Sequence, residues 1–163
     1  MTDNAFLISL FEHKAWCNRR LMETLRAAPA DIDQGKFALI VLTIDHTANV
    51  DEIFQARLQG AEPALASTIP RAMPDLDALT ERMAQTDAWY LDYAANVTPA
   101  DLAETLDFAF VDDGDPGRMT RADILAHIIT HGVAHRAALG KRMADLGIPG
   151  PGEMVTTFRR VEA

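Results

Sequence analysis

The chain has 163 residues, of which 48% are hydrophobic, and a formal net charge of −9. This length predicts a single domain, and the hydrophobic content is sufficient for a packed core. The negative charge argues against nucleic acid and against an anionic membrane surface as partners, because both require a basic protein surface. The chain is rich in Ala, Leu and Met and poor in aromatic residues, which favours helices.

We expect a cytoplasmic protein. The single cysteine, Cys17, excludes an internal disulfide framework and is typical of a reducing compartment. The N-terminus carries no basic residues before its first apolar ones, so it does not resemble a signal peptide. The longest apolar stretch, from Phe37 to Ile44, is too short to cross a bilayer.

The first half of the chain predicts two helices. One runs from about Asp3 to Ala28, where Pro29 ends it. The other runs from about Lys36 to Gln59, and Gly60 is suited to the position after its end. The apolar stripes at helical spacing are Leu7, Leu10, Cys17, Leu21 and Leu25 in the first helix, and Leu39, Leu42, His46, Val50 and Ile53 in the second. We expect these stripes to face the core.

The second half predicts two more helices. After a crossover loop at residues 61–73, the third helix begins at Pro74 or Asp75 and ends near Asn96. Residues 104–110 alternate in part with period two and predict a short extended segment, and the turn-forming run 112–117 follows it. The fourth helix opens with a capping box, Thr120-Arg-Ala-Asp123, and ends near Leu146. Residues 1–149 therefore form the predicted domain, and residues 150–163 are expected to be a surface tail.

Three of the five histidines, His127, His131 and His135, recur at spacing four in the last predicted helix. Residues at this spacing lie on one helix face, close enough for two imidazoles to bind one metal ion. His127 and His135 lie about 12 Å apart along the axis, so one ion takes either the pair His127/His131 or the pair His131/His135. His46, which is predicted to face the core, is the expected third ligand, because a buried imidazole needs a partner.

Other metal motifs are absent from the sequence, including Glu-x-x-His, His-Glu-x-x-His and Cys-x-x-Cys. Three neutral histidines would leave a bound ion with its full charge and an open position, as in catalytic sites. We expect the other candidate residues to have simpler roles. These are a surface position for His13, a solvated side chain for Asn49, a buried and inert thiol for Cys17, a surface or interface ion pair for Arg136, and mostly exposed carboxylates for Glu12, Asp45, Asp51 and Glu52.

Taken together, these features resemble the DinB/YfiT-like superfamily of metalloenzymes over nearly the whole chain. The segments that carry the resemblance are Trp16-Cys-Asn18-Arg19 with Leu21, residues 106–120, and Ile124-Leu-Ala-His127 through His135-Arg136. The resemblance implies an all-α four-helix bundle with helices ordered up-down-down-up, usually as a homodimer. It also implies a divalent ion, zinc or nickel, held by His46, His131 and His135. The chain departs from the family's His-Arg-Gly-Gln pattern at Ala137-Ala138.

Some members of this superfamily are transferases or isomerases that use a low-molecular-weight thiol. The resemblance therefore implies metal-dependent transferase or hydrolase chemistry on a small-molecule substrate. The alternative is a non-catalytic metal-binding protein that acts in a stress response or in protein interactions. A site open to external thiols or anions favours the enzyme, and a sealed site favours the alternative.

Overall fold

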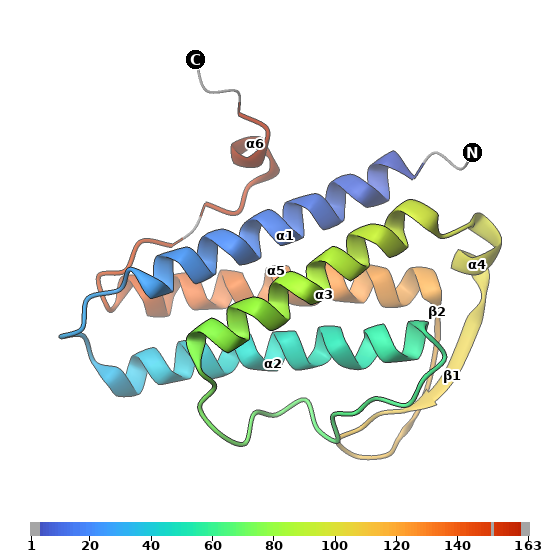
Figure 1. The fold of residues 1–163 in the computed structure, drawn as a ribbon, viewed down its shortest axis with the longest axis horizontal. Coiled ribbons are helices and arrows are strands. Elements are labelled where there is room, and N and C mark those ends of the chain that lie inside the picture. The colour runs from blue at the N-terminus through green and yellow to red at the C-terminus, as the bar shows by residue number, and fades with distance from the viewer. Residues whose placement is uncertain (1–3, 151, 161–163) are drawn as a thin grey trace.

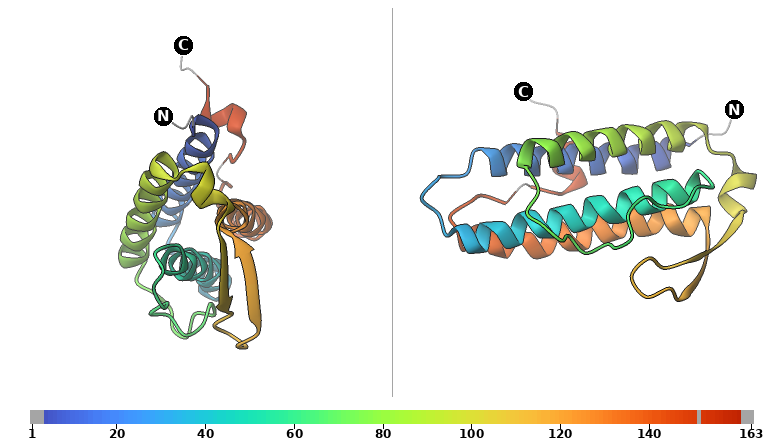
Figure 2. Two further views of the ribbon diagram at one scale, coloured as in Figure 1. Left: turned by 90° about the vertical axis from the view of Figure 1, so that its right-hand side faces the viewer. Right: turned by 60° about the horizontal axis from the view of Figure 1, so that its bottom comes forward.

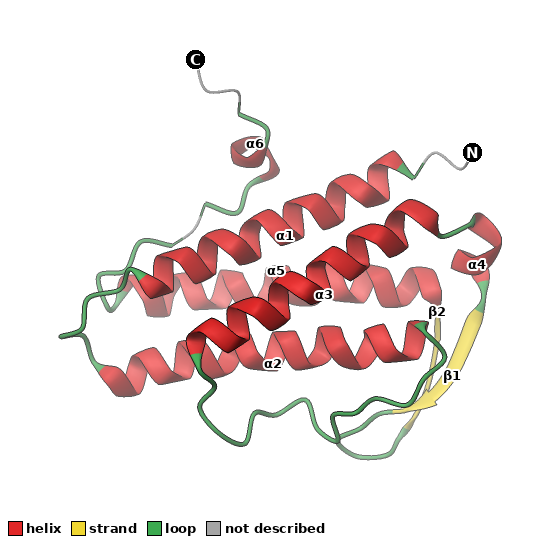
Figure 3. Ribbon diagram, in the orientation of Figure 1, coloured by secondary structure: helices red, strands yellow, loops and turns green. Residues whose placement is uncertain are grey.

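The computed structural model describes residues 4–150 and 152–160. It is mainly helical, with one small β-hairpin (Figures 1 and 3). The elements in chain order are α1 (Ala5–Arg26), α2 (Gln34–Leu58), α3 (Leu76–Asn96), α4 (Pro99–Ala103), β1 (Thr105–Ala109), β2 (Pro116–Thr120), α5 (Arg121–Ala144) and α6 (Val155–Phe158). The predictions of four long helices and of a loop at residues 61–73 are thus confirmed. Every helix in the described ranges is too short or too polar to span a membrane.

The four long helices pack side by side (Figures 1 and 2). Helix α1 lies against α3 and α5, and α2 lies against α3 and α5. Helices α1 and α5 run in one direction, and α2 and α3 run in the opposite direction (Figure 1). Each long helix therefore packs against two of the other long helices, and together these bury a wider face than a single stripe.

This double packing corrects the predicted stripe of α2. Leu39 is 54% exposed, whereas Ile40, Val41 and Ile44 are buried. The buried face of α2 is shifted because the helix must cover both α3 and α5. The core comprises two clusters, one around Leu21, Ile40, Ile44, Leu79, Leu139 and Met143, and the other around Phe11, Val50, Phe54, Tyr90, Ile124 and Ile128.

Residues 105–120 form a β-hairpin before α5, whereas the sequence predicted only its first strand. Strand β1 confirms the extended segment, and it pairs antiparallel with β2, with Leu106 opposite Met119. Strand β2 was not predicted, because Pro116 and Gly117 are turn-forming residues. Helix α4 was not predicted either, and its capping box joins Thr98 and Asp101. The predicted capping box of Thr120 and Asp123 is present at the start of α5.

Part of the C-terminal segment docks on the long helices instead of lying free. The short helix α6 contacts α1, and Phe158 packs near the rings of His13 and Trp16. Glu153 forms an ion pair with Arg136, with 2.8 Å between its Oε1 and the Arg136 Nε. The expected ion pair of Arg136 is thus present, but it lies buried within the chain and not at the surface or at an interface. A buried guanidinium needs an anionic partner, and the segment after α5 supplies it.

Candidate metal centre

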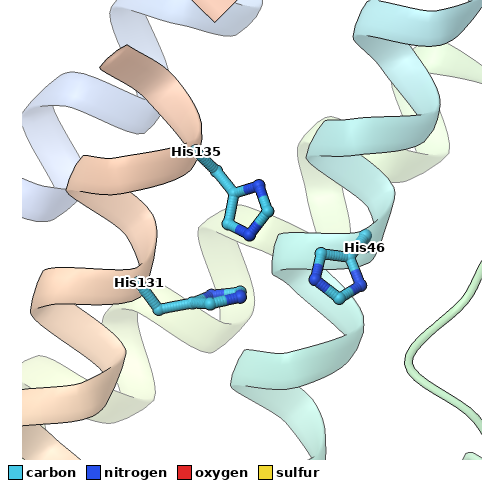
Figure 4. A group of neighbouring side chains, drawn as sticks. All are labelled: His46, His131 and His135. Atoms are coloured by element: carbon cyan, nitrogen blue, oxygen red, sulfur yellow. The ribbon is translucent and has the colours of Figure 1, made fainter. Parts of the chain in front are cut away.

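Three histidines converge between α2 and α5 (Figure 4). His46 points across from the middle of α2 toward His131 and His135, which lie one turn apart on α5. Their potential ligand atoms all lie within 4.8 Å of one another. Two nitrogens bound to one ion at 2.0–2.1 Å lie at most about 4.2 Å apart, so small ring rotations would complete such a site. The fold thus brings together the three residues that the sequence analysis singled out.

The ring of His46 is oriented by a backbone carbonyl. Its Nδ1 lies 3.0 Å from the Thr68 carbonyl oxygen in the loop between α2 and α3. When Nδ1 carries the proton and donates to this carbonyl, Nε2 is left with a free lone pair. Metal-binding histidines commonly make such a bond with the nitrogen that does not bind the metal.

Asp112 anchors the loop that orients His46. Its carboxylate accepts hydrogen bonds from the Thr68 backbone N at 2.9 Å, the Thr68 Oγ1 at 2.6 Å and the Ser67 Oγ at 2.6 Å. The hydrogen bonds from Ser67 and Thr68 hold the pKa of Asp112 below its usual value, so the carboxylate is ionised near neutrality. Asp112 thus links the connection between β1 and β2, through Thr68, to the ring of His46. The sequence carries no periodic signal for this contact.

His131 has the chemistry expected of a metal ligand. Its Nδ1 is buried and has no hydrogen-bond partner within residues 4–150 and 152–160. Burial, together with the neighbouring His135, His127 and His46, lowers the pKa of His131 to about 3. Burial also lowers the pKa of His135. Both rings are therefore neutral near pH 7, and the neutral form is the one that binds metal. A ring nitrogen that is buried without a partner lowers the stability of the fold. The unpartnered nitrogen of His131 is therefore consistent with a site that binds a divalent ion between these rings.

His127 lies outside the group of three. Its ring stacks on that of His131, with 5.1 Å between the ring centroids, and meets the Phe54 ring edge-on at 5.3 Å. Burial lowers its pKa, so this ring is also neutral. Of the two pairs that spacing alone left open, only His131/His135 joins His46 in one cluster. His127 instead forms part of the wall of a neighbouring pocket.

The polar residues near His46 on α2 are more buried than expected. Asp45, Asn49 and Asp51 are only 6% exposed. Arg82 on α3 donates to Asp45 Oδ1 at 2.7 Å, Asn49 Oδ1 at 2.8 Å and Glu52 Oε1 at 2.9 Å. The expectation of exposed carboxylates and a solvated Asn49 was wrong at these positions. Arg82 of α3 covers Asp45 and Asn49, and Lys14 of α1 pairs with Asp51. The ion pairs fix the helix that presents His46.

His13 and Cys17 lie apart from the cluster of His46, His131 and His135. His13 Nε2 lies 2.8 Å from the backbone oxygen of Glu153 and 3.4 Å from Cys17 Sγ, under the C-terminal segment. Cys17 is fully buried, and burial raises the pKa of its thiol to about 11. The thiol is therefore protonated near neutral pH, and only the thiolate is a strong nucleophile. This confirms the prediction of a buried and inert thiol.

The model of the DinB family matches residues 1–162. The chain belongs to the DinB family. No curated protein and no solved structure gave a significant match. The family match spans all four long helices and includes the three clustered histidines. It confirms the family resemblance found in the sequence, and it gives no substrate or reaction for this DinB protein.

Proposed function

We propose that this DinB family protein is a divalent-metal-dependent enzyme in which His46, His131 and His135 bind the ion. The observation that carries the proposal is the convergence of three imidazoles with no carboxylate in the group, among the residues that the structure describes. We further propose zinc or nickel as the metal, a small-molecule substrate, the cytoplasm as location, and a homodimer of up-down-down-up four-helix bundles.

The donor set favours catalysis over a closed structural site. Structural zinc sites are commonly four-coordinate and rich in cysteine, whereas three protein ligands leave a position for water or substrate. A divalent ion bound here would supply Lewis acidity and lower the pKa of a coordinated thiol or water. Thiol-dependent transfer and hydrolysis are therefore the two reactions that this site supports best.

The surroundings of the cluster allow a substrate to approach. A groove of about 260 Å³ is lined by two of the proposed ligands, His46 and His135, and by Ile69, Pro70 and Arg142 among others. His46, His131 and His135 are all half-buried. This access supports the enzyme over the alternative of a sealed, non-catalytic metal-binding protein.

The thiol reaction predicts a spectroscopic result. In cobalt-substituted protein, a low-molecular-weight thiol such as 2-mercaptoethanol should bind through sulfur as the thiolate. Titration should then produce a sulfur-to-metal charge-transfer band in the near ultraviolet, and the His131→Ala variant should not show it. An unchanged wild-type spectrum at millimolar thiol would rule out the transferase and leave water activation as the proposed reaction.

The hydrogen bonds of Asp112 predict that its replacement weakens metal binding, although Asp112 is not one of the three proposed ligands. Asp112→Ala removes the three hydrogen bonds that Asp112 accepts from Ser67 and Thr68 and leaves a longer one, from Asn49 Nδ2 to the Thr68 carbonyl at 3.3 Å, so the carbonyl that orients His46 becomes less fixed. Outer-shell changes of this kind weaken metal binding about 10- to 100-fold. Competition with a chelating dye measures the change.

The matched control is Asp113→Ala. The Asp113 side chain accepts a hydrogen bond from the Asp115 backbone, within the same hairpin connection. This variant should keep the wild-type affinity. If Asp112→Ala also binds zinc as tightly as the wild type, the Thr68 carbonyl does not control the orientation of His46.

A further inference from the structure

An apolar pocket of about 210 Å³ lies beside the cluster of His46, His131 and His135, between α2, α5 and the β-hairpin. Its walls include Phe54 of α2, Phe108 of β1, Phe110 just after β1, and His127 of α5. Val50, Ile53, Val111 and Met119 contribute further apolar lining, and the wall also includes the charged side chains of Arg57 and Asp112. Figure 2 shows the hairpin at the end of the molecule where α2 ends and α5 begins.

The aromatic rings of this pocket form a chain of edge-to-face contacts. Phe54 and Phe108 are perpendicular, with 5.8 Å between the ring centroids, and Phe108 meets Phe110 at 5.2 Å and 80°. Rings in such arrangements present both edges and faces to a guest, and aromatic groups pack well against either. The volume exceeds the 150 Å³ cavity that holds benzene in another protein, so one substituted ring fits.

Two residues of the pocket wall, His127 and Thr68, also contact the histidine cluster. The His127 ring stacks on His131, and the Thr68 carbonyl lies 3.0 Å from His46 Nδ1. A group bound in the pocket would therefore be separated from His131 by the His127 ring and from His46 by Thr68. This proximity is the reason to assign the pocket to the substrate and not to a separate ligand.

We propose that the pocket binds an aromatic ring of the small-molecule substrate whose reacting group lies at the metal. This inference rests on the proposed function for the connection to the metal. It names the substrate class as compounds with one benzene-sized ring close to the reacting group. The predominance of apolar side chains in the wall favours an aromatic ring, and Arg57 and Asp112 are charged side chains of the same wall.

Two measurements test the pocket separately from the metal. The first uses metal-free protein and toluene, with binding followed by saturation-transfer NMR. The second uses cobalt-substituted protein and compares benzyl mercaptan with ethanethiol through the charge-transfer band. Burial of the phenyl group should make benzyl mercaptan bind about 10- to 100-fold more tightly than ethanethiol.

Two variants test whether toluene and the phenyl group of benzyl mercaptan bind in this pocket. Phe110 lines the pocket and is 43% exposed, so Phe110→Ala should leave the fold intact while it opens one wall. We expect this variant to lose the toluene signal and most of the preference for benzyl mercaptan. Phe6→Ala is the matched control, because Phe6 is 79% exposed and lies outside the pocket. It should behave like the wild type.

The outcomes separate the two proposals. Equal affinities of wild-type protein for the two thiols, or a preference that Phe110→Ala retains, would overturn the aromatic pocket. If neither thiol produces a band while metal-free protein still binds toluene in a Phe110-dependent way, the aromatic pocket stands and the thiol chemistry fails. Val111→Trp, which fills the pocket from a half-buried position, should abolish toluene binding without removing a wall.

Discussion

Lys14→Met is expected to lower the free energy of unfolding by about 3–5 kcal/mol. Lys14 is 2% exposed in the core between α1, α2 and α3. Its Nζ lies 2.7 Å from Asp51 Oδ2 and 2.5 Å from Asp87 Oδ1. Burial lowers the pKa of Lys14, but the two carboxylates outweigh it and hold the pKa above its ordinary value. The variant would leave two carboxylates buried without this cation.

The expected loss is a large fraction of the 5–15 kcal/mol that stabilises a typical domain. Urea unfolding followed by circular dichroism measures it on metal-free protein, so metal binding does not contribute. Arg19→Met is the control on the same helix, since the Arg19 side chain is 65% exposed and its contact with Glu23 is long, at 3.9 Å. A loss below about 1 kcal/mol in Lys14→Met would show that the buried ion pairs do not stabilise this core.

The second large effect is the loss of metal-dependent stability in His131→Ala. A metal that binds only the folded state adds about 4 kcal/mol when its free concentration is 1,000 times the dissociation constant. Wild-type protein should therefore melt at a markedly higher temperature in zinc than in chelator. His131→Ala should show no difference between the two conditions.

The same variant should keep its metal-free stability, which separates a ligand from a purely structural residue. His131 Nδ1 is buried and unpartnered among the described residues, so removal of the ring deletes a costly polar atom along with its packing. We expect metal-free His131→Ala to unfold within about 1 kcal/mol of the wild type. A large destabilisation of the metal-free variant, with the zinc effect retained, would assign His131 to the core and not to the metal.

Local signals in the sequence were sufficient to predict the long helices. Asp75 caps α3 and the Thr120–Asp123 box caps α5, as their side-chain chemistry predicts. Strand β2 was missed because its local signals conflict with its structure. Pro116 and Gly117 are turn-forming residues, yet pairing with β1 holds them in a strand. Leu39 fits a helical stripe and is exposed, because the periodicity of one helix does not reveal that it packs against two neighbours.

Prediction of the histidine cluster was most direct for the two members that share a helix. The spacing of His131 and His135 follows directly from helical geometry, and the choice of this pair over His127 came from the family resemblance. The buried charges were not predictable in this way. Lys14, Asp51 and Arg136 have charged side chains that are usually exposed, and their partners lie on other elements. The contact between Asp112 and Thr68 joins two loops, for which the sequence has no periodic signal.

The metal content of dialysed His127→Ala and His135→Ala proteins tests the proposed site most directly. Both residues lie one turn from His131 on α5, but only His135 belongs to the cluster with His46. After zinc loading and exhaustive dialysis, the account predicts about one zinc ion per chain in the wild type and in His127→Ala, and almost none in His135→Ala. Zinc retained by His135→Ala and lost from His127→Ala would contradict it.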